Sequence, residues 1–400
     1  METSLSRISR RTFCAASAAL FAQAALGLEP HTEANAFTLV AHVDRKRILA
    51  AAKRYLPLPP KTITSFPSSK SPGGLHDYFS EADYWWPNPT TPNGPYVERD
   101  GQSDPYNFNG HRAAMIALSI QMPALTAAWL LTGDEKYGRH AADHLRAWFI
   151  NPATVMNPNL EFSQGVHGKS TGRSYGIIDT LHLVEVARAA SIVAPKMLTS
   201  TESQTLREWF TNYLHWMQTS KKGITERDAK NNHATCWGLQ AAEFARLIGD
   251  AQTQSFVAAR YKDDLLPNQM AKDGSFPLEL ARTKPYSYSI FNFDVMATLC
   301  QSLLDHDRNL FAYTLPDGRS ICRAATFLYP YLRDRDAWPY RKDVEHFTSL
   351  PVRSPGLLFT GIACDADKEV QLWKTLNPDP TDSEIVRNYP IRQPLLWFPA

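Results

Sequence analysis

Apolar residues recur at helical spacing along most of the chain after residue 110. In the first such stretch, which begins at His111, Ala114, Leu118 and Leu125 fall on one broad face, and Thr132-Gly133-Asp134 then interrupts the pattern. A period of three to four residues is the mark of an amphipathic helix, and a glycine just after the last apolar position is a common helix end. The pattern therefore predicts a helix that begins at His111 and ends before this Gly-Asp pair.

The same unit, a helix followed by a short polar turn, is repeated along the chain. Gly249-Asp250 ends a later helix as Gly133-Asp134 ends the first one, which predicts structurally equivalent hairpins. Strand-like alternation is scarce. Many antiparallel helix pairs without heptad regularity fit a closed α/α toroid or an open α-solenoid. Further helices are predicted at residues 135–149, 175–193, 201–219, 232–247, 253–270, 287–305 and 321–333.

Two long segments, residues 72–108 and 151–175, are too rich in Pro, Gly, Asn and aromatic residues to form helices. Long irregular connections in a compact domain tend to be functional. We therefore expect them to line a cleft, which favours the toroid over the solenoid. The predicted fold is an all-α, incomplete (α/α) toroid that forms one domain over residues 28–400.

Composition and charge place the chain among ordinary globular proteins. Its 400 residues are 44% hydrophobic and 20% charged, which predicts a sizeable buried core. The 42 basic and 40 acidic residues give a net charge of +2, and no Lys/Arg block stands out. The sequence thus offers no footprint for a nucleic acid, although a local basic patch for another polyanion remains compatible with it.

Residues 1–27 are interpreted as a twin-arginine-type export signal. Ser9-Arg10-Arg11-Thr12-Phe13 precedes an apolar run, and Ala22-Gln23-Ala24 fits a cleavage site. The run is shorter than the roughly 20 apolar residues of a membrane-spanning helix, and no later stretch approaches that length. We therefore expect a periplasmic or secreted protein with no membrane span.

The cysteines give no sign of a metal site. Four remain after the signal, Cys236, Cys300, Cys322 and Cys364, and they allow three pairings between which the sequence does not choose. No CxxC pair and no HExxH helix occurs, so a zinc site has no support. Because Cys236 lies three residues after His233, a Cys/His nucleophile is conceivable, but a buried, packing cysteine is the favoured interpretation.

The start of the helix at residue 232 is unusually polar. Asn231 suits the N-cap, but Asn232 and His233 exceed what capping requires. Removing the proton next to a sugar carboxylate builds further negative charge, which amide donors, an imidazolium or a guanidinium stabilise. Asn232 and Arg282 suit this task, the arginine through its planar fork of donors.

Tyr288 follows Arg282 by six residues. Free tyrosine titrates near 10, and a nearby cation is expected to lower the pKa of Tyr288. The side chain would then take the proton from C5 of the sugar, the carbon that bears the carboxylate, and later protonate the oxygen that leaves when the sugar bond breaks. The competing interpretation places it in an aromatic cluster with its neighbours.

Two further groups of residues are suited to binding a glycan. Residues 156–173 gather amides, a histidine and an arginine around glycines, and such groups hydrogen-bond hydroxyls and carboxylates. Residues 84–86 offer flat rings to sugar faces, although burial in the core competes with this role. The predicted substrate-binding residues are Tyr84, Trp85, Trp86, Arg99, Asn157, Asn159, Gln164, His167 and Arg173.

An ordered set of motifs over residues 75–335 resembles the alginate lyase superfamily, and polysaccharide lyase family 38 more than the mannuronate lyases of family 5. The resemblance implies an (α/α) toroid and a metal-independent β-elimination, without a cofactor, on an acidic polysaccharide. It also implies that Asn232 and Arg282 neutralise the substrate carboxylate while His233 and Tyr288 handle protons. The motifs are Tyr84-Trp-Trp-Pro, Arg99-Asp-Gly101, Met156-Asn-Pro-Asn-Leu160 with Gln164, Gly176-Ile-Ile-Asp179, Asn231-Asn-His233, and Leu278-Glu-Leu-Ala-Arg282 to Tyr288.

The resemblance predicts a lyase that cleaves 1,4-linked uronates, such as alginate or polymannuronate, and leaves 4,5-unsaturated ends. A glucuronan lyase of the same mechanism is an alternative. Tyr288 would be base and acid on syn-configured residues, whereas His233 would be the base in an anti elimination. Other classes are a non-catalytic glycan-binding protein and a glycoside hydrolase, which needs two carboxylates. Those available include Asp83, Asp228, Asp273 and Glu279.

Overall fold

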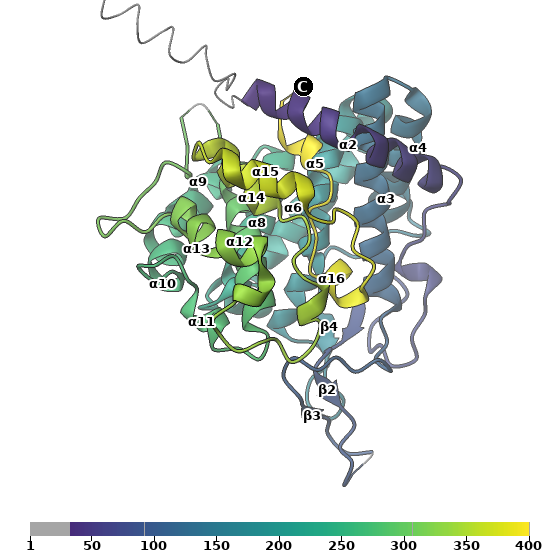
Figure 1. Cartoon of the computed structure of the whole chain (residues 1–400). Helices are drawn as coiled ribbons and strands as arrows, with labels where there is room; N and C mark the ends of the chain where they lie inside the picture. The colour runs from purple at the N-terminus through teal and green to yellow at the C-terminus, as the bar shows by residue number, and fades with distance from the viewer. Residues whose placement is uncertain (1–32, 92, 306, 400) are drawn as a thin grey trace, which may run out of the picture.

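The computed structural model describes residues 33–91, 93–305 and 307–399, which are mainly helical (Figure 1). The predicted export signal lies outside these residues, so the exported location and the division into signal and domain stay predictions. The helices are α2 (Glu33–Tyr55), α3 (Gly110–Thr132), α4 (Glu135–Leu145), α5 (Leu183–Met197), α6 (Ser200–Thr219), α7 (Lys221–Arg227), α8 (Asn232–Ile248), α9 (Ala251–Arg260), α10 (Leu266–Gln269), α11 (Pro277–Leu280), α12 (Pro285–Ser302), α13 (Ile321–Arg333), α14 (Pro355–Ala363), α15 (Asp367–Thr375) and α16 (Ser383–Arg387).

The helices form two layers. In the inner layer α3, α5, α8, α12 and α14 contact one another in this order, and in the outer layer α4 packs on α3 and α5, α6 and α9 on α8, α13 on α12 and α14, and α15 on α14. Near the C-terminus the 3₁₀ turn Pro394–Trp397 packs against α2, α3 and α5. Inner helices such as α8 are buried nearly all round, as expected of helices enclosed by others. The predicted (α/α) toroid is confirmed.

The two Gly-Asp turns are structurally equivalent, as predicted. Gly133 and Gly249 adopt φ angles of 69° and 81° at the ends of α3 and α8. This left-handed conformation favours glycine because it has no β-carbon. Asp134 and Asp250 then cap α4 and α9 by accepting hydrogen bonds from backbone amides. Each pair of residues thus ends an inner helix and begins an outer one.

The prediction of one helix over residues 175–193 is wrong in its first half. Residues Ser174–His182 form a 3₁₀ helix, and α5 begins only at Leu183. Within the 3₁₀ segment, a β-carbon on Gly176 would lie 2.0 Å from the Ser163 hydroxyl. Ser163 belongs to another segment of the chain, so this close approach is a tertiary contact. It accompanies the tighter 3₁₀ winding of a segment whose apolar spacing suits an α-helix.

The two long connections carry short strands. Strand β1 (Phe79–Glu81) pairs in parallel with β4 (Phe162–Gly165), and β2 (Trp85–Trp86) pairs antiparallel with β3 (Val97–Glu98). The β2–β3 hairpin projects from one end of the helical ring (Figure 1). Residues that are far apart in sequence are thereby joined at that end.

One described helix, α3, is long and apolar enough to cross a membrane by length and composition, so the expectation that no later stretch approaches that length is wrong. Of its most apolar window, 61% is buried inside the fold. Burial of this kind is expected of the core helix of a globular domain, so α3 provides only weak evidence for a membrane span.

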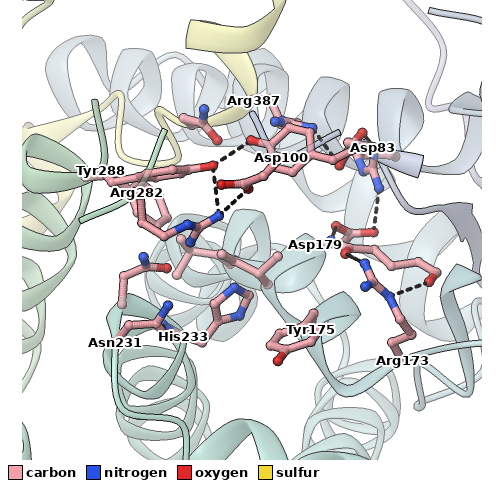
Figure 2. A pocket seen from close by; sticks show the side chains of 18 of the residues that line it. Asp83, Asp100, Arg173, Tyr175, Asp179, Asn231, His233, Arg282, Tyr288 and Arg387 are labelled. Atoms are coloured by element: carbon pink, nitrogen blue, oxygen red, sulfur yellow. Dashed lines mark hydrogen bonds and ion pairs between the residues drawn. The ribbon is translucent and has the colours of Figure 1, made fainter. Parts of the chain in front are cut away.

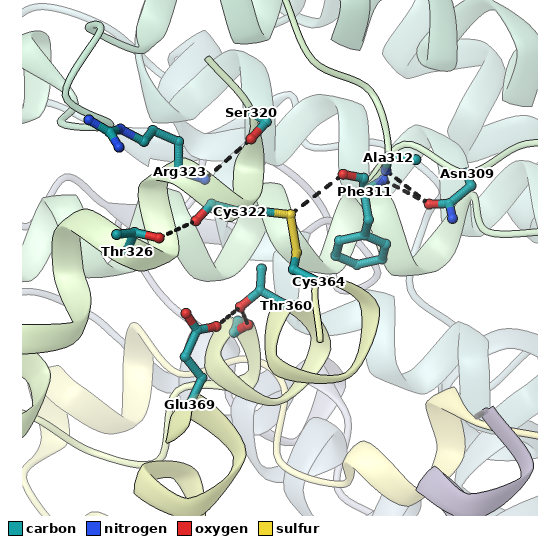
Figure 3. The surroundings of a disulfide bond; sticks show 11 residues. Asn309, Phe311, Ala312, Ser320, Cys322, Arg323, Thr326, Thr360, Cys364 and Glu369 are labelled. Carbon is teal, nitrogen blue, oxygen red and sulfur yellow. Dashed lines mark hydrogen bonds between the residues drawn. A yellow bond between two sulfur atoms is a disulfide. The ribbon is translucent and has the colours of Figure 1, made fainter. Parts of the chain in front are cut away.

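A disulfide joins Cys322 of α13 to Cys364 at the end of α14 (Figure 3). Cys236 and Cys300 are buried free thiols. Burial raises the pKa of Cys236 well above its usual value, and the charges of two nearby glutamates add to this effect. A thiol that keeps its proton is a poor nucleophile, so Cys236 acts as a packing residue, as preferred from the sequence.

Candidate active site

A pocket of about 600 Å³ opens at the end of the ring that carries the β2–β3 hairpin. Residues at or just before the N-termini of α3, α5, α8 and α12 line it. The N-terminus of a helix carries partial positive charge, because the peptide dipoles align and its first amides lack helical partners. The dipoles of these inner helices thus point their positive ends toward the pocket, although the first amides of α8 and α12 already donate to Glu279 and Asp343.

The polar start of α8 lies in this pocket. Asn231 caps the helix by accepting a hydrogen bond from the His233 amide, as predicted. Asn232 lines the pocket, but its backbone and side-chain nitrogens donate to the two carboxylate oxygens of Glu279, at 2.8 and 2.7 Å. Burial raises the pKa of Glu279, against the hydrogen bonds from Asn232. The contribution of Asn232 to neutralising a substrate carboxylate stays a prediction.

His233 is held by a buried carboxylate. Its Nδ1 lies 2.5 Å from Oε1 of Glu226 on α7, and the Tyr175 ring meets the imidazole edge-on at 5.0 Å between centroids. An imidazole that donates from Nδ1 to a carboxylate carries its lone pair on Nε2. His233 also lines the pocket, so Nε2 is suited to accept a proton there.

Tyr288 and Arg282 meet on another wall of the pocket (Figure 2). The Tyr288 hydroxyl lies 2.8 Å from that of Tyr84 and accepts a hydrogen bond of 3.4 Å from Arg282 Nη2. The Arg282 guanidinium also donates to Asp100 at 2.8 Å. In Figure 2 this guanidinium lies between the Tyr288 hydroxyl and the His233 ring. One cation thus contacts Tyr288 and lines the same pocket as His233.

The predicted lowering of the Tyr288 pKa is wrong for the free protein. Burial raises this pKa well above its usual value, Tyr84 raises it further, and Arg282 only opposes the change. Arg282 lies beside the hydroxyl as expected, but the free-energy cost of placing a phenolate in a desolvated site is larger than the stabilisation that this cation provides. Tyr288 therefore carries its proton at neutral pH, as a proton donor must.

Several pocket residues were not foreseen as site residues. Asp83 lies between two arginines, with oxygens 2.5 Å from Arg112 and 2.6 Å from Arg387, and Arg112 also lies 3.3 Å from Asp179. Asp179 ends one of the sequence motifs, but Arg387 is on α16, far along the chain. No local pattern marks it, because the tertiary fold brings α16 to the pocket, where Arg387 pairs with Asp83.

The structure divides the predicted sugar-binding residues. Tyr84, Trp85, Gln164 and Arg173 line the pocket. The other predicted residues do not line it. Arg99 is exposed and stacks on Trp86 at 4.7 Å, and His167 lines a second cavity of about 1070 Å³ beside Tyr96. Asn157 and Asn159 make hydrogen bonds within the fold of their own loop.

The loop asparagines have structural partners. The Asn157 amide donates to Asp77 at 2.7 Å, and Asn159 accepts from the Glu161 amide at 3.1 Å. Asn157→Ala is expected to leave kcat and KM within about twofold and to reduce the free energy of unfolding by about 1.5–3 kcal/mol, the range for a hydrogen bond to a charged group. Steady-state kinetics and urea unfolding measure the two effects. A several-fold rise in KM would instead restore Asn157 to the binding site.

No group of three or more His, Cys, Asp or Glu side chains that could hold a metal ion occurs within residues 33–91, 93–305 and 307–399. The pocket carboxylates of Asp83, Asp100 and Asp179 instead pair with arginines. Metal independence of the reaction stays a prediction.

Comparisons with known proteins agree with this architecture. A sequence model of the alginate lyase family matches residues 62–338. The chain is similar to the crystal structure of an alginate lyase from Bacteroides ovatus, with 28% identity, a TM-score of 0.77 and coverage of 91% of this chain and 97% of that one. It also has the fold of alginate lyase A1-III from Sphingomonas species A1, with 14% identity, a TM-score of 0.51 and coverage of 88% and 95%. The comparison with curated proteins gave no match.

Proposed function

The chain belongs to the alginate lyase family and is a polysaccharide lyase, and from this premise we propose that it cleaves 1,4-linked polyuronates such as polymannuronate by β-elimination. The products would carry a 4,5-unsaturated uronate at the new non-reducing end. The observation that carries the proposal is the contact between Arg282 and Tyr288 in the pocket that also holds His233.

The charges of the pocket support an acidic substrate. A uronate carboxylate beside Arg282 would meet the N-terminal ends of the inner helices and a guanidinium with a planar fork of donors. When the C5 proton leaves, the carboxylate takes up part of the new charge as an enolate-like state. Fixed donors in a desolvated pocket stabilise that state more than water does.

The two proton carriers divide the reaction. On a residue whose C5 hydrogen and O4 lie on opposite faces, His233 Nε2 takes the C5 proton, the C4–O4 bond breaks, and Tyr288 gives its proton to O4. On a syn-configured residue such as β-mannuronate, Tyr288 performs both transfers and must first release its own proton to solvent. Arg282, which lowers the pKa of Tyr288 against the effect of burial, is the group that supports this phenolate.

The geometry gives the hydrolase alternative less support. Asp83 is paired with two arginines, and Glu279 is buried against Asn232. Asp228 and Asp273 do not line the pocket and have partners elsewhere. A hydrolytic acid must hold a proton while it faces the glycosidic oxygen, and these carboxylates do not meet that requirement.

The proposal is tested by incubating the folded protein with polymannuronate, polyguluronate and glucuronan. The expected result is ultraviolet absorbance from the conjugated unsaturated product with at least one of them, and the relative rates choose between the alginate and glucuronan alternatives. Saturated new ends would indicate a hydrolase, and the absence of cleavage of every uronan would contradict the proposal.

The substitution Glu226→Gln tests the role of His233. The glutamine oxygen can still accept from Nδ1, but the variant has no negative charge to stabilise the imidazolium that forms when His233 takes the C5 proton. We expect kcat to fall by about 100-fold or more on anti-configured polyguluronate, the scale of general base catalysis. On polymannuronate, where Tyr288 would be the base, the same variant should lose far less. Equal losses on both polymers would assign Glu226 a structural role only.

A further inference from the structure

Four arginines line the pocket, and one of them differs from the rest. Arg112, Arg282 and Arg387 each form ion pairs with pocket or neighbouring carboxylates. Arg173 forms no ion pair within the part of the chain that the structure describes, and its hydrogen bonds go to neutral acceptors. Burial correspondingly lowers the pKa of Arg173, because the more distant carboxylates compensate only in part for its lost hydration.

The Arg173 guanidinium is held in a fixed position. Its Nε donates to the backbone oxygen of Gln164 at 3.2 Å, and its Nη2 donates to the side-chain oxygen at 3.1 Å. Gln164 adopts a φ of 48°, a strained angle for a residue with a side chain, and it is anchored by Ser80 and Asp179. A donor set that is oriented before a ligand arrives loses little entropy when the ligand binds.

Aromatic rings flank this cation. The guanidinium carbon lies 5.6 Å from the Trp85 ring centroid and 5.3 Å from that of Tyr175. The Tyr175 side chain is 48% exposed, and both rings line the pocket. Figure 2 shows Arg173 and Arg282 on opposite sides of the pocket. One pocket therefore presents two separate cationic groups, and the second has rings beside it of the kind on which sugars pack.

We propose that Arg173 binds the carboxylate of a sugar adjacent to the residue whose C5 proton is removed. This inference rests on the proposed lyase function and specifies its substrate class. Arg282 serves the carboxylate of the reacting sugar, and Arg173 serves that of its neighbour. The enzyme therefore selects polymers with uronates at consecutive positions over polymers in which a uronate alternates with an uncharged sugar.

The physical reason is the unpaired charge. A half-buried cation without a carboxylate partner has lost hydration, and the charge of an anionic ligand compensates for that loss. The binding free energy gained is therefore larger here than at an arginine that is already paired. The carboxylate of the neighbouring sugar is remote from the bond that breaks. Its contact is the same in the ground state and in the transition state, and it should therefore act on KM rather than on kcat.

The experiment combines the variant Arg173→Gln with two uronate oligosaccharides of equal length. One carries every carboxylate, and in the other the sugars next to the cleaved residue are reduced to uncharged hexoses. On the first substrate the variant should lose about 10- to 100-fold in kcat/KM, mostly through KM, as expected for a hydrogen bond to a charged group. On the second substrate the wild type should already have a kcat/KM as low as that of the variant on the first substrate. The variant should match the wild type on this second substrate within about threefold.

Lys169→Gln is the matched control. Lys169 lies over the same Trp85 ring at 4.4 Å, but it is exposed and does not line the pocket, so no change in kinetics is expected. Should Arg173→Gln fail to fold, Arg173→Lys keeps the charge without the fork and should show a smaller loss that again depends on the neighbouring carboxylate. Equal losses on both substrates, or none on either, would overturn the inference. If the wild type is active and the variant gives either of these results, only the role of Arg173 is contradicted. A wild type that cleaves no uronan would instead contradict the proposed lyase function.

Discussion

Tyr288→Phe is expected to reduce kcat by about 10³-fold on every uronan that the protein cleaves, within the range for general acid–base catalysis. The phenol is the proton donor for O4 in either stereochemical course. In an anti elimination it gives its own proton, which burial holds in place by raising its pKa, and in a syn elimination it returns the proton that it took from C5. Phenylalanine retains the ring and its packing but has no proton to give. Initial rates from the ultraviolet absorbance of the product measure the loss, and thermal unfolding should show a similar midpoint.

Tyr84→Phe separates the donor from its hydrogen-bond partner. This variant also breaks the 2.8 Å contact between the two hydroxyls, but it leaves Tyr288 with its proton, so kcat should fall less than about 10-fold. Because Tyr84 raises the pKa of Tyr288, its loss should lower that pKa. On anti-configured polyguluronate, where the neutral phenol is the acid, Tyr288 then ionises sooner as the pH rises, and the alkaline limb of the kcat profile should move to lower pH. A Tyr288→Phe variant that kept a tenth of the wild-type rate would rule out this role for the tyrosine.

Arg282→Gln is the second large effect that we expect, with kcat reduced by about 10²- to 10³-fold, comparable to removal of one oxyanion-stabilising donor. The guanidinium is the cation in contact with Tyr288, and it is placed to receive the charge that develops on the substrate carboxylate. Glutamine keeps hydrogen-bonding ability but not the charge. Arg282→Lys restores a charge without the planar fork and should recover only part of the rate. Steady-state kinetics at saturating polymer measures both variants.

Asp100→Asn tests whether the effect of Arg282 is merely structural. Burial alone would raise the pKa of Asp100, but hydrogen bonds and charge from Arg282, together with Thr283, lower it, so the carboxylate is ionised at neutral pH. The asparagine variant weakens the ion pair while the guanidinium remains. Its kcat should stay within about 10-fold of wild type, because the stabilising cation is still present. A loss as large as that of Arg282→Gln would show that the pair, rather than the cation, sustains activity.

Much of the helical scaffold was predictable because helix signals are local. Apolar spacing, glycine ends and aspartate caps act within a few residues, so the hairpins at Gly133 and Gly249 followed from the sequence. The 3₁₀ start of the segment after Ser174 did not, because a contact with Ser163 accompanies it. The strands β1 and β4 were missed for a related reason, since each needs a partner from a distant part of the chain, and β2 and β3, with two residues each, are too short to show alternation.

The candidate site was predictable only in part. The sequence marked Asn232, His233, Arg282 and Tyr288, and the structure brings all four to one pocket. Loop residues of the same chemical types were indistinguishable by sequence, because the backbone path decides whether an amide faces the pocket or a neighbouring turn. Asn157 hydrogen-bonds Asp77, for example, within the fold.

The sequence by itself determined the helical architecture, the polar start of α8 and the family to which the chain is similar. Only the tertiary structure decided the proton state of Tyr288, the unpaired charge of Arg173 and the entry of Arg387 into the pocket, a residue beyond the 62–338 segment that the family model matches. A helix is set by neighbours three and four residues away. A pKa or a free charge instead depends on burial and on charged groups that distant segments bring together.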